Sequence, residues 1–565
     1  MNPHGRWQLP LLIALAAALT LGTAGWGDLY NETDGQYGGA AKVMARRGSW
    51  LIPENDGIPR LVKPPLLYWT LAASMKIFGV NEFAARLPNA LAVTAWVAVT
   101  FLIGAHMGGN WRGFLAGLIL LTSIGTFTLG RIVMPEPMFS AFIAAALYCV
   151  LRGADHAAHR SKWFFGFWFF ASLASFTKGW HGLLYPLAIV GIAAVFWGPA
   201  RRSLRGLVSW QGALLFAIVN VPWYLYVEFR FPGYLHNLLA AEQFGHLFGA
   251  STPATSYTNV PRWQFLLLHL GWLFPWSLAI IGAAPVIARS FRRRPCGTPK
   301  LPALVVIAWM AVVLGSVLLA GQRQDYYAMS MWPALALAVA WVLERTGMQT
   351  LVLLLAILLG AGLAWSQANP VTTHASNTAA LAERATAWTT IINFDDAVWT
   401  SLRTTAGFAL GGALFFALLA LAFQRSKLKL AAIAASGICL NLGAVSGTSL
   451  VSPYFSLAAV MRYINSGAPI VYDGGIDTGS SLLFYSDSPI ILLDQDPDED
   501  FIVRKFGIGR DRFLTISEFV AYWNSAAPAV FITEEGRLEG WRELLGVSLA
   551  PAARCGTQIL LKNTP

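Results

Sequence analysis

Thirteen apolar segments recur along this chain, and each is close to the length that crosses a bilayer. A membrane-spanning helix needs about 20 mostly apolar residues. A soluble protein carries roughly 25% charged residues, whereas this chain of 565 residues is 12% charged and 56% hydrophobic. The pattern therefore predicts a mostly α-helical, polytopic membrane protein. We expect about thirteen transmembrane helices, near residues 8–25, 83–106, 112–130, 134–152, 163–178, 181–198, 211–229, 263–287, 301–320, 327–344, 349–366, 404–423 and 428–449.

The first of these segments has a second interpretation. It follows Arg6 and ends among small residues, as a secretory signal peptide does. Many further segments follow, however, and no clean A-x-A cleavage site is present, which favours an uncleaved first transmembrane helix.

Basic residues in the short loops orient the segments. Cytoplasmic loops are enriched in Lys and Arg, and under the thirteen-segment count all strongly basic loops fall on one side, together with the N-terminus. The formal charge of +11 is therefore a topology signal, and we do not expect a nucleic-acid partner. The basic loops are residues 152–162, 201–206, 289–300 and 424–429.

The opposite, outer side receives a long first loop, residues 26–82, and everything after residue 450. Residues 451–565 alternate apolar runs ("APIVYDG", "SPIILLD", "PAVFITEE", "TQILLK") with a helical pattern around 515–525. Such alternation predicts a small α/β domain. We therefore divide the chain into a transmembrane domain, residues 1–450, and an outer α/β domain, residues 451–565.

Ionisable residues gather at the outer ends of the predicted helices. Such groups are costly at membrane depth and usually face a cavity or one another. Cations there can hold a phosphate, and a carboxylate can accept a proton from an attacking group. A cavity of this kind suits an anionic, lipid-linked substrate. The residues are Glu32, Asp34, Lys63, Arg131, Glu136, Lys178, His181, Arg323 and Asp325.

Each of these residues also has a purely structural interpretation. Glu32 or Asp34 is placed as a helix cap would be, and Lys63 near an interface can extend its amine to water. The rigid Pro64-Pro65 pair after Lys63 favours a functional role. Arg131 and Glu136 are close enough in sequence to form a structural pair, and the turn that holds Lys178 and His181 needs polarity in any case.

Several motifs on the outer side occur together in a known family. The chain reads "NETDGQYGG", "GSWLIP", "KPPLLYW" and "FGVNEFAARLP" in the first loop, and later "RIVMPEPM", "TKG" and "QRQDYYAMSMWPALAL". Together these closely resemble the bacterial GT-C membrane glycosyltransferases, which include aminoarabinose transferases and protein O-mannosyltransferase-like enzymes. The resemblance covers most of the membrane region and is strongest to the type that transfers 4-amino-4-deoxy-L-arabinose to lipid A.

The resemblance implies a reaction and a location. Such enzymes move a sugar from undecaprenyl phosphate or another polyprenyl phosphate to a lipid, protein or glycan acceptor. The resemblance implies a multi-pass, monomeric protein of the bacterial inner membrane, surrounded by membrane lipids, whose active site and α/β domain face the periplasm. The family's first acidic residue maps onto Asp34 with Glu32 as a rival, its KPP lysine onto Lys63, and a later acidic residue onto Glu136.

The chain departs from the family pattern at three positions. Thr33-Asp34 stands where an adjacent Asp-Glu pair is common, and Glu136 stands where Asp is frequent. Val62 replaces an acidic residue that often precedes the lysine, so we assign no metal site and leave a divalent metal ion open as the only cofactor.

These observations give a predicted site. Asp34 is predicted as the essential carboxylate, with Glu32 secondary and Glu136 supporting. A lipid-linked sugar transporter or flippase is the alternative from another class, but no internal repeat of the kind common in transporters is visible. The predicted substrate-binding residues are Lys63, Tyr37, Arg131, Lys178, His181, Arg323 and Tyr326.

Overall fold

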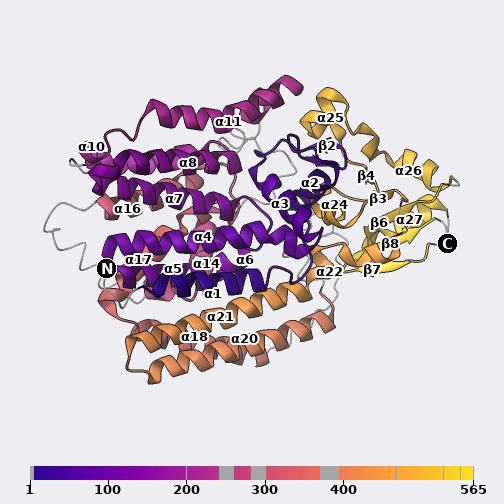
Figure 1. The fold of residues 1–565 in the computed structure, drawn as a ribbon. Coiled ribbons are helices and arrows are strands. Elements are labelled where there is room, and N and C mark those ends of the chain that lie inside the picture. Colours follow the sequence, from indigo (N-terminus) through magenta and orange to yellow (C-terminus); the bar gives the residue numbers. More distant parts are fainter. Residues whose placement is uncertain are drawn as a thin grey trace.

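A bundle of long helices carries a smaller α/β region at one end (Figure 1). The computed structural model describes residues 6–196, 198, 200–240, 260–280, 301–368, 394–464, 467–525, 527–546 and 549–563. We call the end of the bundle next to the α/β region the head end. The N-terminus lies at the opposite end.

The bundle contains a helix in each of the thirteen predicted segments. In the described part of the chain, seven helices are long and apolar enough to cross a membrane, so the protein is membrane-embedded, while the number thirteen stays a prediction. The bundle helices are α1 (Gln8–Gly22), α4 (Glu82–Gly108), α5 (Asn110–Thr122), α6 (Ile124–Leu129), α7 (Glu136–Asp155), α8 (Arg160–Lys178), α9 (His181–Phe196), α11 (Trp210–Arg230), α14 (Arg262–Trp272), α16 (Leu301–Leu319), α17 (Trp332–Thr346), α18 (Gln349–Ala368), α20 (Asp396–Ala422) and α21 (Ser426–Leu450).

Two predicted boundaries were wrong. The segment 112–130 is interrupted at Ser123, which is extended (ψ 135°), so that the N–H of Ile124 donates to the carbonyl of Phe274 at 3.0 Å. Helix α20 begins at residue 396, inside the loop 367–403 that would separate the predicted segments 349–366 and 404–423, because the Asp395 side chain caps it by accepting from the N–H of Val398. Residues 369–393 of that loop and 281–287 of the eighth segment lie outside the described residues.

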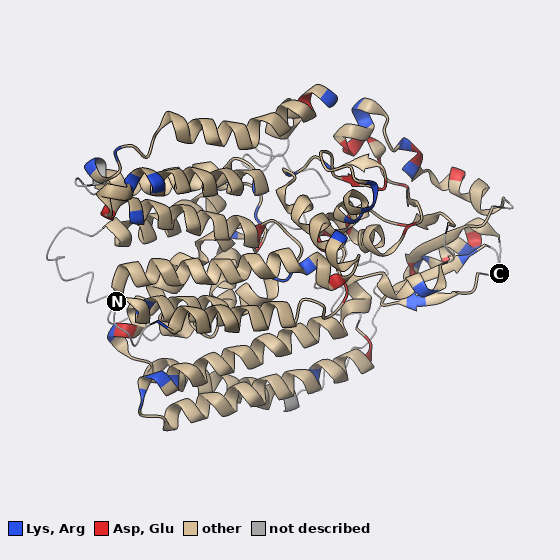
Figure 2. Ribbon diagram, in the orientation of Figure 1, with Lys and Arg blue, Asp and Glu red and all other residues tan. Residues whose placement is uncertain are grey.

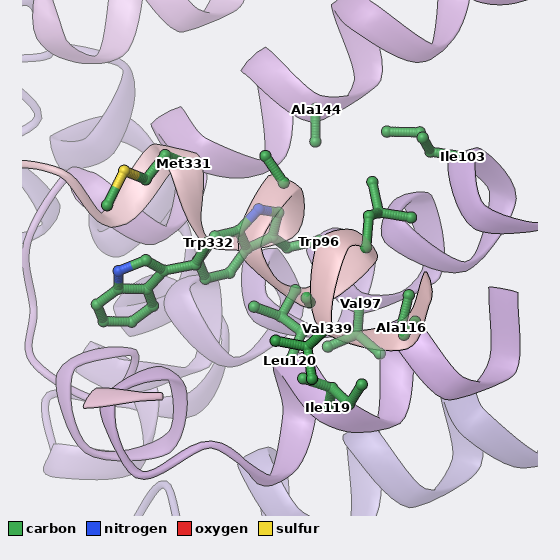
Figure 3. Close-up of a cluster of buried hydrophobic side chains, with 14 of the residues drawn as sticks. Trp96, Val97, Ile103, Ala116, Ile119, Leu120, Ala144, Met331, Trp332 and Val339 are labelled. Carbon is green, nitrogen blue, oxygen red and sulfur yellow. The ribbon is translucent and has the colours of Figure 1, made fainter. Parts of the chain in front are cut away.

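Aromatic and aliphatic side chains fill the centre of the bundle (Figure 3). The indole rings of Trp96 in α4 and Trp332 in α17 stack with their centroids 6.1 Å apart. Val97, Ile119 and Leu120 extend the same buried cluster. Aromatic pairs contribute about 0.5–1.5 kcal/mol beyond the burial of their area, so this layer holds α4, α5 and α17 together beneath the head end.

Charge is distributed unevenly between the two ends of the bundle (Figure 2). The basic loops 152–162, 201–206 and 424–429 lie at the end opposite the α/β region. The fourth basic loop, 289–300, lies outside the described residues. The three described loops therefore share one side, as the sequence predicted.

The first loop is folded into compact structure rather than being an extended connection. It forms helix α2 (Thr33–Arg47), a short hairpin of β1 (Glu54–Asn55) and β2 (Ile58–Pro59), and helix α3 (Leu66–Phe78). Helix α3 starts directly after Pro64-Pro65, where the missing N–H groups cost nothing because first-turn donors have no partner within the helix. The proline pair thus ends the hairpin segment and starts a helix at the head end.

The α/β region contains a six-stranded sheet in the order β5-β4-β3-β6-β8-β7. Strands β5, β4, β3 and β6 are parallel, and β8 and β7 are antiparallel. The four apolar runs named above all form strands, which confirms that part of the prediction. The strands are β3 (Ile470–Tyr472), β4 (Ile490–Leu493), β5 (Phe513–Leu514), β6 (Val530–Glu534), β7 (Ala553–Cys555) and β8 (Gln558–Lys562).

Helices cover both faces of this sheet, because successive side chains of a strand point to opposite faces. Ile470 and Tyr472 pack with the helix α24 on one face, and Val471 packs with α26 and α27 on the other. The division of the chain at residue 450, where α21 ends, remains our interpretation. The helices are α22 (Ser452–Phe455), α23 (Ile476–Gly479), α24 (Ser481–Tyr485), α25 (Phe501–Phe506), α26 (Ile516–Trp523) and α27 (Leu538–Leu545).

Candidate active site

Several bundle helices begin or end at the head end with a polar residue. Helix α7 begins at Glu136, α8 ends at Lys178 and α9 begins at His181. Antiparallel neighbours joined by a short turn bring such termini to one level. Residues predicted from separate motifs are therefore neighbours in the fold.

Glu136 and Lys178 form a buried ion pair. The Lys178 amine lies 2.8 Å from Oε1 of Glu136, and the two side chains are only 17% and 6% exposed. The amine also lies 5.1 Å from the ring centroid of Tyr327. Within the described residues, Oε2 of Glu136 has no hydrogen-bond partner. The expected structural pair of Arg131 with Glu136 was wrong, because the lysine takes the carboxylate and Arg131 lies elsewhere.

Lys63 and His181 belong to the same neighbourhood. Both Lys63 and Lys178 are close enough to His181 to interact with it electrostatically. Lys63 is half-buried and precedes the Pro64-Pro65 pair that leads into α3, whereas Lys178 and His181 stand at helix ends. Three groups that can bind an anion therefore converge at the head end from the first loop, α8 and α9.

The turn before α17 adds a carboxylate and a tyrosine. Burial raises the pKa of the Asp325 carboxyl, and the charge of Glu136 adds to that effect. Tyr326 lies within electrostatic range of Glu136 and Tyr37. The structure thus brings Tyr37 of the first loop and Glu136 of α7 close to this turn.

Asp34 occupies a different, closed environment. Its side chain is buried (3% exposed), and its oxygens accept the N–H groups of Tyr30 at 3.1 Å and Val133 at 2.5 Å. The Arg86 guanidinium lies 3.9 Å from Asp34 Oδ2. Burial raises the pKa of Asp34, although Arg86 and the two N–H groups oppose this. Asp34 therefore ties the first loop to the turn before α7.

Two arginines complete this closed environment. Arg86 donates to the carbonyls of residues 24, 26, 27 and 28, and Arg131 donates to those of Thr23 and Trp26. These bonds satisfy carbonyls that follow the end of α1. We call Asp34, Arg86 and Arg131 the closed cluster. The predicted substrate-binding role of Arg131 stays a prediction, and its visible contacts are to backbone.

Glu32, two residues before Asp34, is an exposed residue that carries a carboxylate. Within the described residues this carboxylate accepts no hydrogen bond. Protein atoms around the accessible side chain still remove enough water to raise the pKa of Glu32, and the charges of Asp477 and Asp325 raise it further. We call Glu32, Lys63, Glu136, Lys178 and Asp325 the open cluster, because it holds the accessible carboxylate and the convergent amines.

The Arg323 side chain is less accessible than we expect for a substrate-binding residue. It is buried (6% exposed), and its guanidinium donates to the carbonyls of Val260, at 3.1 Å, and Ala320. These contacts hold the turn that carries Asp325. A contact of Arg323 with substrate remains a prediction.

Sequence reasoning missed two residues of this neighbourhood. The Arg60 guanidinium lies over the Tyr37 ring, 5.2 Å from its centroid, and it interacts with Tyr68 and Asp477. Arg60 precedes Lys63 by three residues, so proximity to the KPP motif was the available signal. Asp477 lies more than 440 residues after Glu32, and nothing local in its sequence marks it.

The residues fit a metal site poorly. In the part of the chain that the structure describes, no group of three or more His, Cys, Asp and Glu residues is arranged to hold an ion. Glu136 is engaged by Lys178, and Val62 stands where an acidic ligand would precede Lys63. We derive no step through a metal.

Comparisons with known proteins identify relatives. Residues 10–238, less than half of the chain, match the family of dolichyl-phosphate-mannose-protein mannosyltransferases. An undecaprenyl phosphate-alpha-4-amino-4-deoxy-L-arabinose arabinosyl transferase of Pseudomonas fluorescens is 25% identical over 60% of this chain, and one of Proteus mirabilis is 24% identical over 47%. The matched parts span 59% and 48% of those relatives.

The fold match is more extensive than the sequence match. The crystal structure of ArnT from Cupriavidus metallidurans bound to undecaprenyl phosphate aligns with 98% of this chain and 98% of its own length, with a TM-score of 0.80 and 19% identity. Its apo form gives a TM-score of 0.79. This chain therefore has the fold of the GT-C membrane glycosyltransferases, and the aminoarabinose transferases are its relatives in sequence.

Proposed function

We propose that this protein is a glycosyltransferase that moves a sugar from a polyprenyl phosphate to an acceptor at the head end of the bundle. The observation that carries the proposal is the open cluster, where amines of the first loop and α8 lie beside carboxylates that include an exposed one. The names of the relatives and the ligand of the aligned ArnT structure support a lipid-linked donor.

The donor phosphate fits the cationic side of the open cluster. Lys63 and Lys178, together with His181, can surround a phosphate that is attached to a lipid chain lying among the helices. When the bond from the anomeric carbon to the phosphate oxygen breaks, negative charge grows on the leaving phosphate. Fixed cations at that point stabilise the transition state, which is usually a large electrostatic contribution. Polyprenyl phosphate is then the leaving group, and no nucleotide-linked sugar donor is needed.

Glu32 is the carboxylate best placed to meet the acceptor. Asp34 has both oxygens occupied, whereas the Glu32 carboxylate is accessible and lies near Asp325. A hydroxyl acceptor would give its proton to Glu32 as it attacks the anomeric carbon. A phosphate acceptor is already a nucleophile, and Glu32 would then orient it or stabilise positive charge on the sugar. Glu136 supports the site by positioning Lys178.

Our proposal for the substrates follows the relatives. We assign 4-amino-4-deoxy-L-arabinose as the sugar and lipid A as the acceptor, with a protein or another glycan as the alternative acceptor. The protein would act as a monomer in the bacterial inner membrane, with its basic loops in the cytoplasm and its α/β region in the periplasm. The placement of the basic loops opposite the α/β region supports this orientation.

The test is a transfer assay with the purified full-length protein in lipid vesicles. Labelled aminoarabinosyl undecaprenyl phosphate and lipid A are supplied together, and mass spectrometry follows the acceptor. We expect lipid A that is heavier by one aminopentose. Movement of the labelled lipid between leaflets without a new glycosidic bond would support the flippase alternative instead. Modification of a co-supplied glycan or protein, but not of lipid A, would replace the acceptor and keep the reaction class.

A further inference from the structure

Glu32 has an unusual backbone conformation. Its φ is 65° and its ψ is −116°, a region that residues with a Cβ rarely adopt. Such a strained conformation persists only where the surrounding structure enforces it. The contacts that enforce it are therefore part of how the exposed carboxylate is aimed.

Those contacts come from the α/β region. The N–H of Glu32 donates to the carbonyl of Asp477 at 2.8 Å, and the hydroxyl of Ser480 donates to the carbonyl of Glu32 at 3.1 Å. The preceding residue is held in the same way, since the N–H of Ser481 donates to Oδ1 of Asn31 at 3.0 Å. Glu32 is thus held from both sides by the segment formed by α23 and the start of α24.

Glycines of α2 allow this close approach. A Cβ on Gly35 would lie 2.3 Å from the carbonyl carbon of Ser480, and one on Gly39 would lie 2.5 Å from Cβ of Leu483. The side-chain amide of Gln36 also donates to the Asp477 carboxylate. Helix α2 and the α/β region are therefore in direct contact at the two residues that hold Glu32.

Charged groups from two elements face the Glu32 carboxylate. Asp477 of α23 and Asp325 of the turn before α17 are both within electrostatic range, and Arg60 of the first loop faces Asp477. The negative charge of Asp477 adds to burial in raising the pKa of Glu32. The α/β region thus influences both the direction and the ionisation of this carboxylate.

We infer that Asp477 and Ser480 are positioning residues for the transfer reaction, which makes the α/β region part of the active site rather than an appendage. The inference rests on the proposed function and on the role of Glu32 within it. Ser480 fixes the backbone that aims the carboxylate. Asp477 fixes the same backbone through its carbonyl and biases the carboxylate through its charge.

The experiment compares Asp477→Asn and Ser480→Ala with wild type in the transfer assay, over a range of pH. Asp477→Asn keeps the backbone carbonyl and the shape but loses the charge, so the pKa of Glu32 falls. Since ionised Glu32 is the active form, activity is lost as pH falls through this pKa, and the acidic limb of the profile should move to lower pH. Ser480→Ala should lower kcat by about 2–10-fold with little change in donor KM, equivalent to one lost hydrogen bond.

Matched controls are Asp498→Asn and Ser525→Ala, which make the same chemical changes at exposed sites of the α/β region. The Asp477→Asn shift should also vanish in a Glu32→Gln background, where no carboxylate remains to respond. If wild type transfers sugar and both variants match their controls, the inference is wrong while the proposed function stands. If wild type transfers nothing, the proposed function itself fails.

Discussion

The closed and open clusters contain similar residues, yet their surroundings differ. In the closed cluster, both carboxylate oxygens of Asp34 accept hydrogen bonds from backbone N–H groups. The guanidinium groups of Arg86 and Arg131 donate to backbone carbonyls. In the open cluster Glu32 has no such partner among the described residues, and one oxygen of Glu136 is left over. An unpaired buried polar atom such as Oε2 of Glu136 is costly, so a ligand that bonds to this atom would offset that cost. The closed cluster is already complete.

The strongest test of this difference is Glu32→Gln. The amide keeps the size of the side chain but can neither carry charge nor accept a proton as a base. We expect a loss of roughly 10²–10⁴-fold in kcat, the usual effect of removing a general base, with unchanged thermal stability. Steady-state transfer rates of the purified variant measure it, and Glu54→Gln in the same loop is the control. Normal turnover by Glu32→Gln would show that Glu32 of the open cluster is not the catalytic carboxylate.

Lys63→Ala should have the next largest effect. Loss of a charge-assisted contact with phosphate, about 1.5–3 kcal/mol, corresponds to roughly 10–100-fold in donor KM. Lys63→Arg should recover part of this, because charge survives while geometry changes. Transfer rates against donor concentration measure both variants, and Lys76→Ala on α3 is the control. Equal KM values for Lys63→Ala and wild type would mean that Lys63 does not bind the donor phosphate and only extends its amine to water at the membrane interface.

Asp34→Asn should have the smallest effect on activity. Its amide oxygen can accept one of the two N–H groups, but its NH₂ group faces the other, which loses a bond worth about 1–3 kcal/mol when buried. We expect a lower apparent melting temperature and less than a tenfold change in turnover per folded molecule. Thermal unfolding and transfer assays of one preparation separate the two, with Asp511→Asn as an exposed control. A stable but inactive Asp34→Asn would restore the sequence-based prediction that Asp34 is essential.

The sequence alone determined the general architecture. Long apolar segments have to be buried in lipid or protein, and β-rich runs such as "APIVYDG" form strands wherever a partner strand exists. Both properties are local, so the helix positions and the four strands could be read directly. The placement of the basic loops on one side could also be predicted, because it depends only on which loops are rich in Lys and Arg. The grouping of Glu136, Lys178 and His181 followed once the segments had been counted. Successive segments cross the membrane in opposite directions, so the count places all three residues on the same side.

Only the tertiary structure decided what each polar residue contacts. Asp34 receives the N–H of Val133, 99 residues away, and Glu32 is held by residues more than 440 positions later. The family motif favoured Asp34, whereas the geometry leaves Glu32 accessible. The break at Ser123 likewise depends on a carbonyl in another segment. Hydrogen-bond partners so distant leave no periodic trace in the sequence, because they are set by how packed elements meet and not by the preference of any one segment.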